Sequence, residues 1–181
     1  ARAVRQNLDA GQIVVMAAGN DRSVAPVYAE NPSGVGLFPF VQPANEGATN
    51  SSGALIYDDH GSGLDLSFPS AAALAAAEQA DGIARGRIVV VVALDAYNRL
   101  ASYSNQCGVA REWCISAPGG DQSTYFSSAH QAGDRGIDST VPEGYTPSTN
   151  ANFPAPDGYA FYQGTSMAAP NVAGAIAVLI E

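Results

Sequence analysis

The sequence predicts an α/β domain with a mostly parallel central sheet. Two wholly apolar runs support this fold class, Ile13–Met16 and Ile88–Leu94, because strands buried on both faces have continuous apolar sequences. The third observation is the order of elements around the first run. A short amphipathic helix over Ala1–Ala10 ends before Gly11, and the apolar strand then leads into a turn of small residues. This succession is typical of a parallel α/β sheet.

The stretches between the apolar runs are less regular. Residues 21–70 are punctuated by proline and glycine and predict loop with short strands, such as Ala54–Tyr57. The segment Ser70–Ala84 is rich in alanine and begins with a capping serine, which predicts a helix. Residues 98–120 predict a strand with turns, and the polar residues 119–152 predict surface loop.

The last segment, Ser166–Ile180, is apolar nearly all round, which predicts a helix in the core. No repeat or linker divides the 181 residues, and 46% of them are hydrophobic. The chain is therefore one domain or part of one.

Composition excludes several classes of function. The formal net charge is -9, and all eight basic residues are arginine, so the clustered positive charge that binds nucleic acid is lacking. No apolar run reaches the roughly 18 residues of a membrane span. Two cysteines and two distant histidines do not form a zinc ligand set, so no metal site is predicted.

The two cysteines, Cys107 and Cys114, are near enough in sequence to close a short loop. A disulfide between them would stabilise the fold by about 2–3 kcal/mol on chain-entropy reasoning. The alternative is a pair of reduced thiols in a cytosolic protein, and the residues alone leave both readings open.

The strongest chemical signal is the string Gly164–Gly174, GTSMAAPNVAG, in which Ser166 stands at the start of the final helix. A helix N-terminus offers unpaired N–H groups and a partial positive charge, which suit a developing oxyanion. Gly164 allows a tight turn before the serine. The plainer alternative is that Ser166 caps an ordinary helix.

The string resembles the nucleophile motif of subtilisin-like serine proteases almost position for position. It departs at Asn171, where that family usually has histidine, and it is not the Gly-x-Ser-x-Gly elbow of α/β-hydrolases. Val14–Asn20 resembles the family's strand-end segment, whose asparagine supplies an oxyanion donor from the carboxyl end of the sheet. Val90–Gly119, with its Ser-Asn and Ala-Pro-Gly turns, and the Ser-Thr pair at 139–140 are similar to intervening family segments.

The resemblance implies a subtilisin-like three-layer fold of which residues 1–181 are the C-terminal portion of one catalytic domain. Residues near 21–70 and 120–138 have no counterpart in the motifs and are expected to be loop insertions. The implied activity is that of a serine endopeptidase acting through a Ser166 acyl-enzyme, with the Asn20 amide as oxyanion donor. The implied substrate-binding residues are Ala17, Ala18, Gly19, Gly164 and Thr165.

The family's catalytic residues follow the order Asp, His, oxyanion Asn and Ser, which places the acid and base upstream of Ala1. His60 lies on the wrong side of Asn20, and His130 lies in a polar loop, so neither is expected to be the base. We therefore expect the chain alone to be inactive and to work with an N-terminal fragment of the same protease. The resemblance calls for no catalytic cofactor and is compatible with a structural calcium ion, for which the loop carboxylates Asp58, Asp59 and Asp65 are remote candidates.

Secreted bacterial subtilases of the autotransporter kind resemble this chain in a further respect, a cysteine pair between the Ser-Asn and Ala-Pro-Gly turns. That likeness favours the Cys107–Cys114 disulfide and a secreted or cell-surface location. Two rival functions stay open: a non-catalytic binding or adhesion module on the same scaffold, and a serine carboxyl peptidase. Asn20 argues against the second rival, which has Asp at the oxyanion position.

Overall fold

The structure is a computed structural model that describes residues 2–27, 29–33, 36, 87–121, 136–142 and 159–181. The strand expected at 54–57 and the helix expected at 70–84 lie outside the described residues. The two expected insertions, 21–70 and 120–138, lie largely outside them as well.

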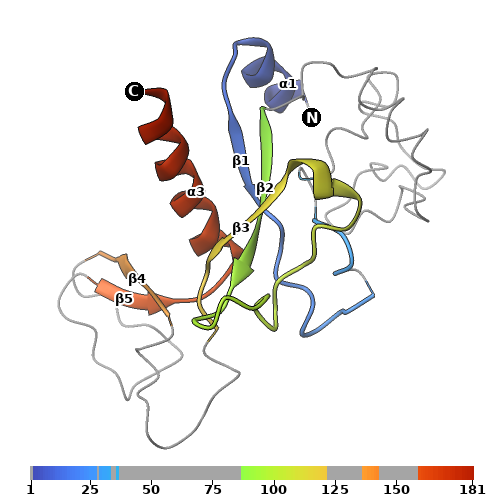
Figure 1. Cartoon of the computed structure of the whole chain (residues 1–181), viewed down its shortest axis with the longest axis vertical. Coiled ribbons are helices and arrows are strands. Elements are labelled where there is room, and N and C mark those ends of the chain that lie inside the picture. Colours follow the sequence, from blue (N-terminus) through green and yellow to red (C-terminus); the bar gives the residue numbers. More distant parts are fainter. Residues whose placement is uncertain (1, 28, 34–35, 37–86, 122–135, 143–158) are drawn as a thin grey trace, which may run out of the picture.

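Three parallel strands form the main sheet, in the order β1-β2-β3 (Figure 1). They are β1 (Val14–Ala17), β2 (Ile88–Leu94) and β3 (Cys114–Pro118). Met16 pairs with Val90, and the three carboxyl ends lie at one edge of the sheet. The parallel α/β architecture predicted from the apolar runs is confirmed.

The central strand β2 is buried because both of its faces are covered. Val91 and Ala93 face a cluster with the C-terminal helix, whereas Val90 and Val92 face a second cluster on the opposite side. Two buried faces explain why this strand is apolar at every position. β1, at the edge of the described sheet, is only partly buried.

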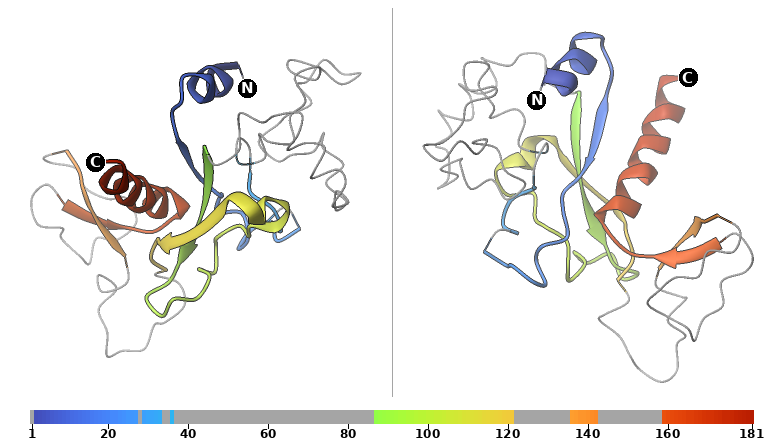
Figure 2. Two further views of the ribbon diagram at one scale, coloured as in Figure 1. Left: turned by 45° about the horizontal axis from the view of Figure 1, so that its top comes forward. Right: turned by 180° about the vertical axis from the view of Figure 1, so that it is seen from behind.

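Helix α3 (Thr165–Ile180) lies across one face of the sheet and contacts all three strands (Figures 1 and 2). Its buried residues are Thr165, Ala168 and Val172. The expectation that this helix lies within the core is wrong for the described structure, because the sheet covers only one of its faces. Leu179 near its end is 84% exposed.

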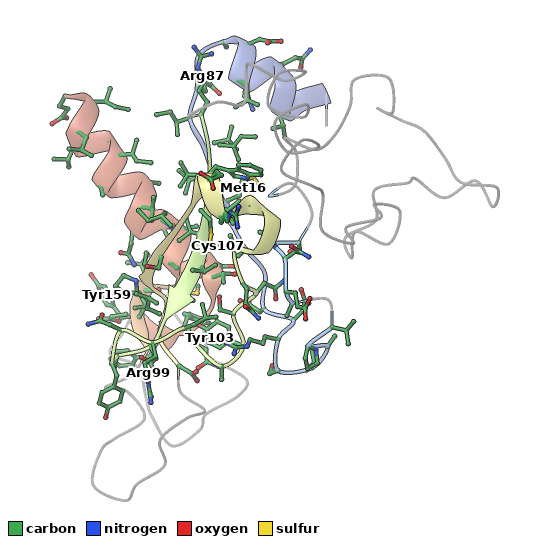
Figure 3. The ribbon with its side chains drawn as sticks, turned by 45° about the vertical axis from the view of Figure 1, so that its right-hand side comes forward. Met16, Arg87, Arg99, Tyr103, Cys107 and Tyr159 are labelled. Carbon is green, nitrogen blue, oxygen red and sulfur yellow. A yellow bond between two sulfur atoms is a disulfide. The ribbon has the colours of Figure 1, made fainter. Side chains whose placement is uncertain are left out.

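Helix α1 (Arg2–Asp9) confirms the short N-terminal helix. Among the side chains of α1 that the structure describes, Leu8 is buried. The Leu8 carbonyl accepts a 2.6 Å hydrogen bond from Nη1 of Arg87, which is labelled in Figure 3. Gly11, with φ +83°, follows the helix and turns the chain toward β1.

A two-stranded antiparallel ribbon, β4 (Ile137–Thr140) and β5 (Tyr159–Tyr162), precedes α3. The prediction of loop across 119–152 is therefore wrong at β4. Four residues with a single large apolar side chain give no periodic signal, and the strand exists through its pairing with β5, about 20 residues further on.

Cys107 and Cys114 form a disulfide with an S–S distance of 2.06 Å and a Cα–Cα distance of 5.8 Å. The bond closes over the 3-10 helix η3 (Gly108–Trp113). The predicted pairing is confirmed. Along the described part of the chain, no helix is long and apolar enough to cross a membrane.

Candidate active site

Ser166 is the second residue of α3, and the capping position belongs to Gly164, which makes no side-chain cap. The serine side chain is exposed and forms no hydrogen bond with the described part of the chain. Ser166 is therefore not a helix cap, which removes the plainer reading of the motif. Its backbone N–H lies in the first turn, where amides have no intrahelical acceptor.

Asn20, just beyond the end of β1, has its amide orientation set by Thr165. Its Oδ1 accepts hydrogen bonds from the Thr165 backbone N–H at 3.0 Å and the Thr165 hydroxyl at 2.9 Å. A backbone N–H can only donate, so Oδ1 must face Thr165 and Nδ2 must face away. The exposed Asn20 thus presents its donor group in a defined direction.

Asn20 Nδ2 and the Ser166 backbone nitrogen both lie close to Gly164. A Cβ atom built on Gly164 would lie 3.4 Å from Asn20 Nδ2 and 3.6 Å from Ser166 N. Both nitrogen atoms are thus within 4 Å of one point at the start of α3. Gly164 has φ +152°, a conformation that side chains disfavour. Two neighbouring N–H donors that point to one position can hold a negatively charged oxygen.

Thr165 is fully buried and joins the end of β1 to the start of α3. Its hydroxyl accepts a hydrogen bond from the Gly19 backbone N–H at 3.1 Å and donates its own proton to Asn20. The hydroxyl therefore has a complete set of partners within the fold. Its predicted contact with substrate stays a prediction.

The other predicted substrate-binding residues lie around the same edge of the sheet. Ala17, at the end of β1, and Gly19, which has a φ angle of +109°, are both partly buried. Ala18 is fully buried and packs in the second core cluster, so it presents no surface in this structure. Gly164 is buried beside the two donors. Whether these residues contact a substrate stays a prediction.

Tyr103 is a site-supporting residue that sequence reasoning missed (Figure 3). Its buried hydroxyl donates to the carbonyls of Gly119, at 2.9 Å, and Gly120. The Gly119 carbonyl also accepts the N–H of Gly164 at 2.9 Å, which links the turn after β3 to the start of α3. Burial raises the pKa of Tyr103 well above its ordinary value, and the Asp121 carboxylate adds to the shift.

Asn171, the one departure from the family's nucleophile motif, has a structural role. Its Nδ2 donates to the Pro118 carbonyl at 3.0 Å and to the Met167 carbonyl at 3.2 Å. The side chain thus ties α3 to the carboxyl end of β3.

Asp95 is a buried carboxylate at the carboxyl end of β2. Both of its oxygen atoms accept hydrogen bonds within the turn that follows this strand. It accepts hydrogen bonds from the backbone N–H groups of Tyr97 and Arg99 and from the Arg99 guanidinium at 2.9 and 3.0 Å. Burial acts to raise its pKa, but these hydrogen bonds outweigh burial and hold the pKa below its usual range. Asp95 is therefore a structural group and not a candidate base.

The chain's two histidines, His60 and His130, lie outside the described residues, as do Asp58, Asp59 and Asp65. The described ranges hold no cluster of three or more His, Cys, Asp or Glu side chains that could bind a metal ion.

The structure thus places an exposed serine at a helix N-terminus, near the Asn20 amide and at the carboxyl end of a parallel sheet, an arrangement compatible with a serine hydrolase. The sequence profile of the subtilase family (peptidase family S8) matches residues 1–181. The chain belongs to the subtilase family, which is a family of serine proteases.

Individual relatives match shorter parts of the chain. Serotype-specific antigen 1 of Mannheimia haemolytica is 47% identical over 32 residues, which are 18% of this chain and 3% of that protein. The crystal structure of a lanthipeptide protease is similar over 49% of this chain and 25% of the other, with 32% sequence identity and a TM-score of 0.38. The chain thus spans a quarter or less of the length of these relatives.

Proposed function

We propose that this chain carries the nucleophile and oxyanion half of a serine endopeptidase. Ser166 Oγ attacks the carbonyl carbon of a peptide bond, and its proton passes to a histidine base outside this chain. The C–N bond then breaks, the base returns the proton to the departing amine, and the acyl group stays on Ser166. The same base then deprotonates a water molecule, whose oxygen attacks the acyl carbon. The ester bond to Ser166 Oγ breaks, the base returns the proton to that oxygen, and the acyl group leaves as a carboxylic acid.

The observation that supports this proposal best is the proximity of Asn20 Nδ2 and Ser166 N to one point beside Gly164. In the proposed reaction, both groups donate to the oxygen that becomes negative in the tetrahedral intermediate. Loss of the Asn20 donor is expected to lower kcat by about 10²–10³-fold, a magnitude taken from subtilisin, itself a member of this family.

The acid and base are proposed to come from an upstream segment of the same protease, as the order of the family's motifs implies. Strand β1 supports this, because within the described sheet it pairs on one side only. A further parallel strand, paired with the outer edge of β1, would place its own C-terminal residues at the end of the sheet where Ser166 lies. The 181-residue chain without that segment is therefore expected to be inactive.

We further propose a secreted or cell-surface protease of proteins or peptides. The disulfide favours an oxidising compartment, and the name of the Mannheimia relative describes an antigen. An autotransporter-type protein is the form that fits the cysteine pair. Catalysis as proposed requires no cofactor, and a structural calcium ion is compatible with it.

Labelling with a fluorophosphonate probe, followed by intact-mass analysis, tests the proposal. The protein carrying the upstream segment should gain one label, located on Ser166 by peptide mapping, and the Ser166→Ala variant should gain none. The 181-residue chain alone should label slowly or not at all. Rapid labelling of Ser166→Ala would contradict the assignment of the nucleophile. An unlabelled Ser166 in the assembled protein would instead favour a non-catalytic binding or adhesion module.

A further inference from the structure

The side chain of Asn105 is fully buried, and both of its polar atoms form hydrogen bonds with the segment that follows β1. Its Oδ1 accepts the backbone N–H of Asp21 at 2.8 Å. Its Nδ2 donates to the Asp21 carboxylate at 2.9 Å and to the Asn31 carbonyl at 3.3 Å. A buried amide with every group satisfied is rigid, and removing it would break three hydrogen bonds to the partly buried Asp21 and Asn31.

The backbone of Asn105 holds the same segment from a second point. Its N–H donates to the Gly19 carbonyl at 3.0 Å. Gly19 and Asp21, the two residues that flank Asn20, are therefore both bound to Asn105.

Gly19 passes Asn105 at very close range. A Cβ atom on Gly19 would lie 2.7 Å from Asn105 Nδ2 and 2.6 Å from Ser33 Oγ, and the φ angle of Gly19 is +109°. The backbone before Asn20 thus adopts a conformation that glycine accommodates, and the contacts on either side allow little displacement.

Two separate devices therefore fix Asn20. Thr165 sets which way its side-chain amide faces, and Asn105 sets the path of the backbone that carries it. An exposed asparagine on a loop would otherwise sample several rotamers. An oxyanion donor is effective only if it is already in place when charge develops.

We propose that Asn105 is a positioning residue that keeps the Asn20 amide directed toward the oxyanion. The inference rests on the proposed function of Asn20. Asn105 has no exposed surface, so it acts through Asn20 and not on the substrate. Asparagine suits this place because one short planar group supplies both an acceptor and two donors. Aspartate has the same shape but only accepts, and it would set a second negative charge against Asp21.

The test is a double-mutant cycle in the full-length protease, read by the kinetics of fluorophosphonate labelling. The variants are Asn105→Asp, Asn20→Ala and the two together, and the readouts are the maximal labelling rate and the probe concentration at half saturation. Asn105→Asp should lower the maximal rate by about 10- to 100-fold, since misplacing a donor costs no more than removing it. The half-saturating concentration should change less than about 3-fold. In the Asn20→Ala background, Asn105→Asp should have almost no further effect on the rate.

Controls separate positioning from damage to the fold. Gln106→Ala alters the exposed neighbour of Asn105 and should leave the rate unchanged. The exchange Asp21→Asn with Asn105→Asp restores a donor facing a carboxylate and should recover most of the lost rate. If Asn105→Asp does not fold, Asp21→Ala removes the carboxylate that Asn105 holds without changing the buried position, and the same cycle is read on that variant.

An equal loss of rate in both backgrounds, or no loss in a folded Asn105→Asp protein, would overturn the inference and leave the proposed function intact. Undiminished labelling of Ser166→Ala would instead overturn the proposed function.

Discussion

Tyr103 illustrates how a single buried hydroxyl connects parts of the site. It donates to the carbonyls of the turn after β3, and the Gly119 carbonyl in that turn also accepts the N–H of Gly164, two residues before Ser166. Gly119 must be glycine, because a Cβ there would lie 2.5 Å from Ala93 Cβ. The phenol therefore stabilises a closely packed turn that supports the start of α3, where the proposed nucleophile lies.

Replacement of this tyrosine should make the fold less stable and change its response to alkali. Tyr103→Phe removes the donor to the Gly120 carbonyl, which should lower the free energy of unfolding by about 1–3 kcal/mol. Because the pKa of Tyr103 is raised, the folded protein keeps the phenol proton after the unfolded chain has lost its own. This contribution to stability is complete below the ordinary tyrosine pKa of about 10 and is lost as pH rises above it. Urea denaturation of the full-length protein between pH 8 and 11 measures both effects.

Tyr159→Phe, on the exposed surface of β5, is the matched control and should change stability by less than about 0.5 kcal/mol. A Tyr103→Phe protein as stable as the parent, with the same alkaline slope, would show that the hydroxyl contributes nothing.

Local motifs pointed to the residues proposed to react, but not to the residues that position them. Ser166 and Asn20 could be proposed because each stands in a contiguous string typical of the family. The hydrogen bonds that orient Asn20 join residues 145 positions apart, and those of Asn105 to Asp21 join residues 84 apart. Such pairings depend on how the sheet assembles and leave no trace in local periodicity.

Among the elements, η3 depends most on a covalent constraint. This 3-10 helix of six residues has no side-chain cap, and the Cys107–Cys114 disulfide joins its two ends. Both cysteines and Trp113 pack against the second core cluster, and Trp113 Nε1 donates to the Gly36 carbonyl at 3.1 Å. The bond thus holds a short, weak helix against the face of the sheet opposite α3.

Removal of the disulfide should lower the stability of the fold moderately, through a local effect. Cys107→Ala with Cys114→Ala should lower the free energy of unfolding by about 2–3 kcal/mol, the value expected for a loop of this length. Thermal denaturation with and without reductant measures it. Reductant should lower the Tm of the parent protein and leave that of the double variant unchanged. An effect of reductant on the double variant would contradict this account.

Elements with strong apolar patterns could be predicted, and elements that depend on a partner could not. The bounds of β2 follow from its seven apolar residues, since both faces are buried. The four residues of β4 have no such pattern. The helical conformation of α3 could be predicted from its sequence. The burial of only one side of this helix could not, because its sequence is apolar on all sides.

At the scale of the whole molecule, the described structure has an unpaired strand edge and an exposed apolar helix end. Strand β1 has no described partner on its outer edge. The last turn of α3 exposes Val178, Leu179 and Ile180 by 73%, 84% and 69%. Unpaired strand edges and contiguous exposed apolar residues favour association with another chain.

The 181-residue chain on its own should therefore self-associate, and the upstream segment should suppress this. Sedimentation velocity at about 10–100 µM should show oligomers of the isolated chain. Co-expression with the upstream segment should give a 1:1 complex with a higher Tm, because a partner that binds only the folded state stabilises it by mass action. Leu179→Glu places a charge on the exposed turn of α3 and should reduce self-association of the isolated chain. If the isolated chain is monomeric and as stable as the complex, these surfaces are native exterior and the proposal of an upstream partner fails.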